Sequence, residues 1–251
     1  MSSASRHAAP AAPAPQHNCV LASLAASSLS RFEPLLEVVS LDCGAVLSLA
    51  GVNEEHAYFP TTAILSLQQG LDGNSGTEVA MVGRDGMSGA CIVIGDGCSS
   101  RNTLVHCPGL AYRLPAQVLR TEFDSSADFR EKLFRCFQVQ MAQIAQNVPC
   151  YRLHSVDQQL CKRLLMLLDA LPSMEVPVTQ ELLASALGVR REAITIACSR
   201  LMADGIIRPG RGRIHVLDPA RLELHACECR SNLVREVARL LPAPESSFAR
   251  N

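Results

Sequence analysis

The residues with the most specific chemistry in this sequence are six arginines: Arg190, Arg191, Arg200, Arg208, Arg211 and Arg213. Only Glu192 and Asp204 oppose them within that stretch, although the chain of 251 residues has a formal net charge of −1. A guanidinium group presents a planar fork of donors to phosphate oxygens, and phosphate contacts supply most of the sequence-independent affinity for DNA. The grouping therefore predicts a surface that binds nucleic acid.

Two short helices and a hairpin must position these arginines. Thr179 is a typical N-cap residue, and apolar residues follow it at helical spacing until Gly188, which can adopt the left-handed conformation that ends a helix. A second helix is predicted over about 190–203, before Gly205. β-branched runs then flank the turn residues 209–212, which indicates a hairpin. This is the order of a winged helix-turn-helix, which places its second helix in the major groove of DNA. A helical hairpin with solvated charges, packed on a small sheet, is the alternative.

Composition favours two compact domains. Hydrophobic residues make up 48% of the chain and charged residues 19%, and no apolar run reaches the roughly 18 residues that a membrane span needs. The Ala/Pro-rich stretch 1–18 lacks the apolar core of a secretory signal, so we expect a disordered tail on a cytoplasmic protein without membrane contact. The 11 cysteines are scattered through apolar segments, which favours reduced, buried thiols.

The front half is predicted to be all-β. Short apolar runs between about 32 and 114, including 90–95, alternate with Gly, Asn, Asp and Pro, which is typical of a sandwich or jelly roll. Residues 72–74 have the composition of a hairpin tip. A jelly roll of this size can hold a small ligand between its sheets.

Two helices are predicted to join the halves. The first, over 128–150, carries an apolar stripe at steps of three and four residues, and Pro149 is expected to bend or end it. We expect the stripe to meet a partner helix in a two-fold dimer, which would place two recognition helices one DNA turn apart; packing on its own sheet is the alternative. The second, over 156–171 with Ser155 as N-cap, should pack against the DNA-binding unit. The stripe consists of Phe129, Leu133, Phe137, Met141 and Ile144.

Five segments resemble a known superfamily. They are YFPTTAILSL (58–67), EVAMVGRDGMSG (78–89), LHSVDQQLCKRLLMLLD (153–169), VTQELLASALGVRREAI (178–194) and LMADGIIRPGRGRIHVLD (201–218). Over roughly residues 30–230 the chain is similar to the regulators named after cyclic-AMP receptor protein and fumarate-nitrate regulator (Crp/Fnr). The resemblance implies an α+β fold with an N-terminal β jelly roll, a long dimerisation helix and a C-terminal winged helix-turn-helix. It also implies a homodimeric transcription factor that contacts RNA polymerase and responds to an effector.

This architecture predicts the division of the chain and its DNA-facing residues. The parts are a disordered tail (1–18), a jelly-roll effector-like domain (19–124), a dimerisation helix (125–150), a winged helix-turn-helix (151–230) and a C-terminal tail (231–251). The residues expected at DNA are Thr179, Gln180, Arg190, Arg191, Glu192, Thr195, Arg200, Arg208, Arg211 and Arg213.

Base reading is expected from the pair that opens the second helix. The family's Arg-Glu pair matches Arg191 and Glu192, which can bind guanine O6/N7 and accept from cytosine N4. Gln180 resembles a phosphate-contacting position. The family's further arginine falls at Ile196, which departs from the family pattern. The alternative function is therefore a ligand- or partner-binding module that has lost specific DNA binding.

The effector site departs from the cyclic-nucleotide pattern. Gly89 matches the family glycine, but Ala90 stands where a glutamate would hold the ribose, and Arg101, Asn102 and Thr103 lie near the phosphate position in a shifted register. We therefore expect an effector other than cyclic AMP. Cys19 is the one cysteine near the N-terminus, so the family's iron–sulfur cluster is not expected, and no cofactor is predicted.

The remaining motifs give no further function. His225, Cys227 and Cys229 have metal-ligand chemistry, but Cys-x-Cys is tighter than the usual zinc spacing and no second cysteine pair follows. We expect inward-pointing thiols and no metal, and the sequence leaves metal binding or redox sensing by this group open. The chain has no Walker loop, H-E-x-x-H or dinucleotide fingerprint, and 86–89 do not meet G-x-S-x-G, so no enzyme is predicted.

Overall fold

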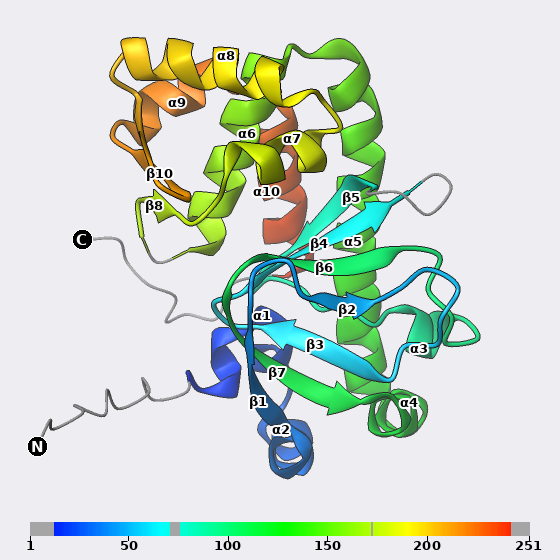
Figure 1. Ribbon diagram of the computed structural model, residues 1–251. Coiled ribbons are helices and arrows are strands. Elements are labelled where there is room, and N and C mark those ends of the chain that lie inside the picture. Colours follow the sequence, from blue (N-terminus) through cyan, green and yellow to red (C-terminus); the bar gives the residue numbers. More distant parts are fainter. Residues whose placement is uncertain (1–12, 71–75, 172, 242–251) are drawn as a thin grey trace, which may run out of the picture.

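The strands that the structure describes in the first half of the chain form two antiparallel sheets. The computed structural model describes residues 13–70, 76–171 and 173–241. One sheet has the order β1-β7-β3 and the other β2-β6-β4-β5 (Figure 1). The hairpin tip expected at 72–74 lies outside the described residues. The strands are β1 (Glu37–Leu41), β2 (Val46–Ser48), β3 (His56–Pro60), β4 (Ile64–Gln69), β5 (Thr77–Val82), β6 (Asn102–Cys107) and β7 (Gly109–Pro115).

Alternating burial along the strands places an apolar core between the sheets. β5 alternates between half-buried and buried positions, so that Ala80 and Val82 face the core while Met81 packs against the core of the helical domain. Leu65, Val105 and Ala111 complete this part of the core. The predicted β-domain is confirmed.

Two segments of this domain differ from expectation. Residues 90–95 are not a strand, because Cys91–Ile94 form the short helix α3 after Gly89, whose φ is +98°. The tail expected over 1–18 ends earlier, because Pro15–His17 already form a 3-10 helix and the Asn18 side chain is buried. Asn18 donates to Pro60 O (2.9 Å) and Gly86 O (2.8 Å), which attaches this segment to the β-domain. The helices α1 (Cys19–Ala22) and α2 (Ala26–Phe32) follow, with a 3-10 turn at Glu33–Leu35.

The long helix α5 (Ala127–Leu153) follows α4 (Ala116–Ser125) and runs along the β-domain (Figure 1). Pro149 lies inside α5 and does not end it, which was one of the two expected effects, since the helix continues for four more residues. A proline removes one backbone donor, and the turn after it is kept by Cys150, whose carbonyl accepts from His154 N (3.2 Å).

The apolar stripe expected to meet a partner helix packs instead on the protein's own β-domain. Phe129, Leu133 and Phe137 are buried in one cluster with Phe59 and Leu114 of the sheet. Ile144 packs against the cluster between the two sheets, and Met141 alone of the five points outward. That expectation is therefore wrong for four of the five residues. Their spacing selects one helix face, and in this fold the β-domain already covers it.

The second half of the chain is a helical domain with a small sheet. Ser155 caps α6, as predicted, and also forms a capping box with Gln158. Asp218 caps α9, which begins at Pro219. The elements are α6 (Val156–Ala170), β8 (Glu175–Val176), α7 (Gln180–Leu187), α8 (Arg191–Ala203), β9 (Ile207–Gly210), β10 (Arg213–Val216), α9 (Pro219–His225) and α10 (Cys229–Leu240), with sheet order β8-β10-β9.

The C-terminal segment 231–241 is not a tail. Residues 231–240 belong to α10, which lies against α5 in Figure 1, and Leu240 and the following Leu241 are buried with Val139 of α5. The sequence carries a signal for this helix that was missed, because Leu233, Val237 and Leu240 recur at steps of four and three residues. Among the described helices, none is both long enough and apolar enough to cross a membrane.

A buried polar seam joins the two domains, formed by Glu78 of β5, Asn147 and Tyr151 of α5, and Lys162 and Arg163 of α6. Arg163 makes two hydrogen bonds to the Glu78 carboxylate, one of them 2.8 Å long, and both side chains are 3% exposed. Tyr151 Oη donates to Glu78 O (2.9 Å), and Asn147 Nδ2 donates to Val79 O (3.0 Å). The helical domain is thus held to β5 by hydrogen bonds between buried polar groups, although Arg163 Nε has no hydrogen-bond partner among the described residues.

Candidate nucleic-acid interface

Local capping builds the turn between α7 and α8 as predicted. Thr179 Oγ1 accepts from Leu182 N (3.2 Å) and begins α7, and Gly188 ends it in the left-handed region with φ +64°. Gly188 also lies against β5, because a Cβ built on it would be 2.7 Å from Thr77 Oγ1. The turn is therefore fixed both by its own backbone and by the neighbouring domain.

The helix α8 turns one face inward and one face to solvent. Ile194, Ala197 and Leu201 are buried against α6 and α7. The opposite face lies on the outside of the molecule, at the end away from the β-domain (Figure 1). Its exposed residues are Arg191, Glu192, Thr195, Ile196, Ser199 and Arg200. The polar groups that were expected to read DNA are thus accessible.

Two of these side chains hold each other. Thr195 Oγ1 donates to Gln180 Oε1 (2.8 Å) and lies 3.1 Å from Arg191 O. This bond orients the Gln180 amide at the start of α7, so its NH₂ group remains a donor for a phosphate oxygen. Thr179, in contrast, uses its hydroxyl oxygen to cap α7.

The arginines differ in how they are held. Three form ion pairs that water reaches: Arg191 with Glu181 (3.7 Å), Arg200 with Asp157 (3.0 Å) and Arg213 with Glu175 (2.6 Å). Exposed pairs of this kind contribute about 0–1 kcal/mol, so a phosphate can replace the carboxylate. In the part of the chain that the structure describes, no ion pair holds the remaining three, Arg190, Arg208 and Arg211.

Ile196 is a candidate contact that the sequence reasoning treated only as a departure. Its side chain is 53% exposed in the middle of the outward face of α8, among polar neighbours. An exposed apolar side chain at this place can contact the methyl group of thymine. The signal was present in the sequence, because Ile196 is one turn beyond Glu192 and falls on the same face.

The expected effector residues come together in part. Gly89, Ala90, Arg101 and Thr103 line one pocket of the β-domain, together with Glu54 and Gln140. Asn102 has another role, because its Oδ1 accepts from Ala50 N (2.8 Å). Sequence reasoning missed Glu54: burial raises the pKa of its carboxyl, against the opposing charge of Arg101. A carboxyl group and a guanidinium thus share this pocket, although Ala90 supplies no acid.

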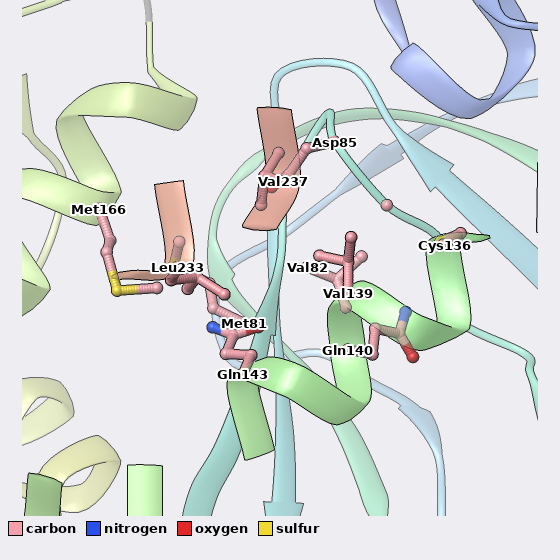
Figure 2. A pocket seen from close by; sticks show the side chains of 11 residues that line it. Met81, Val82, Asp85, Cys136, Val139, Gln140, Gln143, Met166, Leu233 and Val237 are labelled. Carbon is pink, nitrogen blue, oxygen red and sulfur yellow. The ribbon is translucent and has the colours of Figure 1, made fainter. Parts of the chain in front are cut away.

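A second pocket lies between β5, α5, α6 and α10. Figure 2 shows Met81 and Val82 of β5, Val139 and Gln143 of α5, and Leu233 and Val237 of α10 around it. Gln140 lines this pocket and the first one. Asp85 is at its edge, and burial raises the pKa of that carboxyl. The pocket exists because α10 covers α5, which the sequence did not predict.

The cysteines near the C-terminus have partners that the sequence reasoning did not find. Cys227 and Cys229 are buried, as expected for inward thiols, but they face Cys150 and His154 at the end of α5. His225 does not belong to this group. The expectation that no further ligands complete the pair considered only the residues after Cys229, whereas Cys150 and His154 precede the pair in the chain.

Comparisons with known proteins agree with this architecture. Residues 158–224 match the family model of the Crp-like helix-turn-helix domain. No curated protein sequence matches the chain significantly. Among solved structures, FixK2 from Bradyrhizobium japonicum is similar with a TM-score of 0.64 and 12% identity, over 76% of this chain and 98% of that one.

Two further structures show the same fold. A CRP/FNR-family transcriptional regulator from Thermus thermophilus has a TM-score of 0.61 and 20% identity, over 76% of this chain and 98% of that one. The c-di-GMP responsive global regulator CLP of Xanthomonas campestris has a TM-score of 0.60 and 13% identity, over 76% of this chain and 99% of that one. The chain therefore shares the fold of these regulators, a β-domain and a long helix followed by a Crp-like helix-turn-helix domain.

Proposed function

We propose that this protein is a sequence-specific DNA-binding transcriptional regulator that acts as a homodimer. The observation that carries the proposal is the outward face of α8, which presents Arg191, Glu192 and Ile196 beyond a buried apolar face. The Crp-like helix-turn-helix match supports it. Because the helix-turn-helix domain is Crp-like, we also propose RNA polymerase as a partner and the cytoplasm as the location.

The three exposed residues suggest a mode of base reading. Arg191 can donate two hydrogen bonds to guanine O6 and N7, Glu192 can accept from cytosine N4, and Ile196 can contact a thymine methyl group. Phosphate contacts would come from Thr179 and Gln180, from Thr195 beside them, and from the remaining arginines. Those arginines are Arg190, Arg200, Arg208, Arg211 and Arg213, the last three in or beside the hairpin of β9 and β10.

DNA binding is tested by retention of genomic fragments in an electrophoretic shift, followed by sequencing of what is retained. We expect selective retention of fragments that share one motif, and a decrease in affinity as salt rises, because cations are released from the phosphates. A protein that retains no fragment at low salt, or retains all fragments equally, would instead be a binding module without sequence-specific DNA recognition.

The homodimer is supported by a second stripe on α5. Phe134, Met141 and Val148 recur every seven residues on its outer face, and their side chains are 51%, 64% and 69% exposed. Gln138 and Ala145 alternate with them on the same exposed face. Apolar residues at this spacing form the seam of paired helices. This stripe, rather than the one that packs on the β-domain, is the surface for a second copy.

Met141→Asp tests this surface. Two charges would face each other across the two-fold axis, so we expect a shift towards monomer in sedimentation velocity. Met174→Asp is the matched control, because Met174 is also exposed but lies outside α5. A variant at position 141 that remains as dimeric as the control would assign the contact to another surface.

We further propose that the effector of the β-domain pocket is not cyclic AMP. Ala90 cannot hold a ribose hydroxyl, and Arg101 already has the Glu54 carboxyl as a neighbour. Calorimetric titration with cyclic AMP and cyclic GMP is expected to give no micromolar binding. Micromolar binding that Glu54→Gln abolishes would show that Glu54 replaces the missing acid and would overturn this part of the proposal.

A further inference from the structure

Four metal-ligating side chains meet where the long helix ends. Cys150 and His154 belong to the last turn of α5 and the residue after it, and Cys227 and Cys229 belong to the connection between α9 and α10. Their ligand atoms all lie within 4.8 Å of one another. The three cysteines are buried, and the His154 side chain is 17% exposed. We refer to these four residues as the Cys₃His cluster.

The distances within the cluster are those of ligands around one ion. The sulfur atoms of Cys150 and Cys227 are 3.7 Å apart, and Cys229 Sγ is 3.5 Å from His154 Nδ1. Tetrahedral zinc, with Zn–S of about 2.3 Å and Zn–N of about 2.0 Å, requires sulfur atoms about 3.8 Å apart and a sulfur–nitrogen distance of about 3.5 Å. A disulfide would require sulfur atoms about 2.05 Å apart.

The sequence spacing supplies the ligands in two pairs. Cys150 and His154 are four residues apart, so they project from the same side of α5. Cys227 and Cys229 are separated by one residue, where the chain leaves α9 and turns into α10. The Cys-x-Cys pair need not form a site alone, because each pair contributes two of four positions.

The surroundings of the cluster suit thiolates around a cation. Lys162 Nζ lies 3.2 Å from Cys150 Sγ, and Gln146 Nε2 donates to Cys229 Sγ (3.2 Å). Glu228 Oε1 lies 3.3 Å from His154 Nε2, so a carboxylate orients the ring and directs Nδ1 towards the sulfurs. Donors to metal-bound sulfur and a carboxylate behind a ligating histidine are common features of metal sites.

Charge balance gives the buried lysine a role. Three thiolates, one neutral imidazole and Zn²⁺ carry a net charge of −1, and Lys162 beside Cys150 carries +1. Lys162 is 4% exposed and its other hydrogen-bond partner is the neutral Asn147 amide (2.8 Å). A buried charge is costly without a partner. A zinc thiolate centre would supply a negative charge in direct contact with Lys162, in addition to the Tyr151 ring that its ammonium faces and the Glu78 carboxylate with which it interacts.

We propose that Cys150, His154, Cys227 and Cys229 bind one Zn²⁺ as a structural site. Four protein ligands leave no open position, so the site has no catalytic role. On binding, the ion forms three Zn–S bonds and one Zn–N bond, and each cysteine that was a thiol releases its proton to solvent. The ion would connect the end of α5 with the start of α10 and thereby fix the helix-turn-helix domain on the long helix.

Metal content of the full chain is the direct test. We expect about one zinc per chain in protein purified under reducing conditions and dialysed against Zn²⁺, and a Co²⁺-substituted form with the absorption of tetrahedral thiolate coordination. Cys227→Ser should lose the metal. Cys161→Ser is the matched control, because Cys161 is equally buried and lies outside the cluster, and it should keep the metal.

The outcome does not depend on DNA binding. Wild-type protein that takes up no Zn²⁺ or Co²⁺ after reduction would overturn the site. The site would also be overturned if the purified protein contained a Cys150–Cys227 disulfide and remained free of metal after that disulfide was reduced. If Cys227→Ser does not fold, Cys227→His keeps a ligand at this position and should retain zinc while changing the Co²⁺ spectrum. A Cys227→His protein with an unchanged Co²⁺ spectrum would exclude this residue as a ligand.

Discussion

The arginines of α8 and the arginine of the polar seam have the same chemistry in opposite environments. Arg191 is 66% exposed and only 3.7 Å from a carboxylate that is itself exposed, whereas Arg163 is 3% exposed and bonded twice to Glu78. An exposed pair can be exchanged for a phosphate at little cost, but a buried one cannot open without leaving a desolvated charge. The charges that we propose to bind DNA are therefore weakly held, and the charges that join the domains are fully enclosed.

Arg163→Ala should produce the largest effect. It leaves the Glu78 carboxylate buried without its ion-pair partner, so we expect the free energy of unfolding to fall by about 3–5 kcal/mol in urea denaturation. The double variant Glu78→Leu/Arg163→Met, which removes both charges, should recover most of that loss. A loss below about 1 kcal/mol for the single variant would mean that the buried Arg163–Glu78 pair contributes no more to stability than the exposed pairs do.

Arg191→Ala should weaken specific DNA binding by about 1–3 kcal/mol and relax the preference at one base pair. The reason is the loss of a two-donor contact with a base edge. Fluorescence anisotropy with a selected site and its single-base variants measures this, with Arg235→Ala of α10 as the control, since Arg235 is exposed away from α8. Equal weakening for every sequence would assign Arg191 to a phosphate.

The buried His106, near Arg163, should make the stability of the protein depend on pH. Burial, and then the charge of Arg163, hold the pKa of its imidazole well below its ordinary value of about 6.5. Below about pH 6.5 the unfolded chain therefore takes up a proton that the folded protein does not. The free energy of unfolding should fall as pH decreases, by up to about 1.4 kcal/mol per pH unit from this group.

Urea denaturation at a series of pH values measures that slope. His106→Phe lacks the titrating ring, so its slope just below about pH 6.5 should be smaller than that of the wild type. Identical slopes would mean that His106 is protonated in the folded protein despite its burial and the nearby charge of Arg163.

Asp157→Asn should produce the smallest effect on stability. It removes the carboxylate that pairs with Arg200 in a solvent-exposed contact, so the free energy of unfolding should change by less than about 1 kcal/mol. Arg200 would then be released for a phosphate, and we expect DNA affinity to rise by no more than about fivefold. A loss of stability like that of Arg163→Ala would remove the distinction between the two classes of arginine.

The helix-turn-helix was predictable because its signals are local. Thr179 begins α7, Gly188 ends it, and the apolar spacing of α8 selects the face that is buried. Each of these features acts within a few residues, so the sequence alone contains it. The exposure of Ile196 follows from the same periodicity and could have been used to predict a contact with DNA.

Features that depend on distant segments were missed. The stripe of Phe129, Leu133 and Phe137 has the right spacing for a partner helix, and only the position of the β-domain decides what it contacts. The Cys₃His cluster joins residues more than 70 positions apart, as Cys150 and Cys227 show. Spacing within one segment could not reveal either. Glu54, which enters the pocket from a loop before β3, is a third case.

The contact between Gly188 and Thr77 has an evolutionary consequence. Gly188 has no room for a side chain, both because of its left-handed backbone and because Thr77 fills the space beside it. In related sequences whose helix-turn-helix corner carries asparagine, the residue at the start of β5 should accordingly be smaller than threonine. If the residues at these two positions change together across an alignment, the contact between the two domains has been conserved while the sequences diverged.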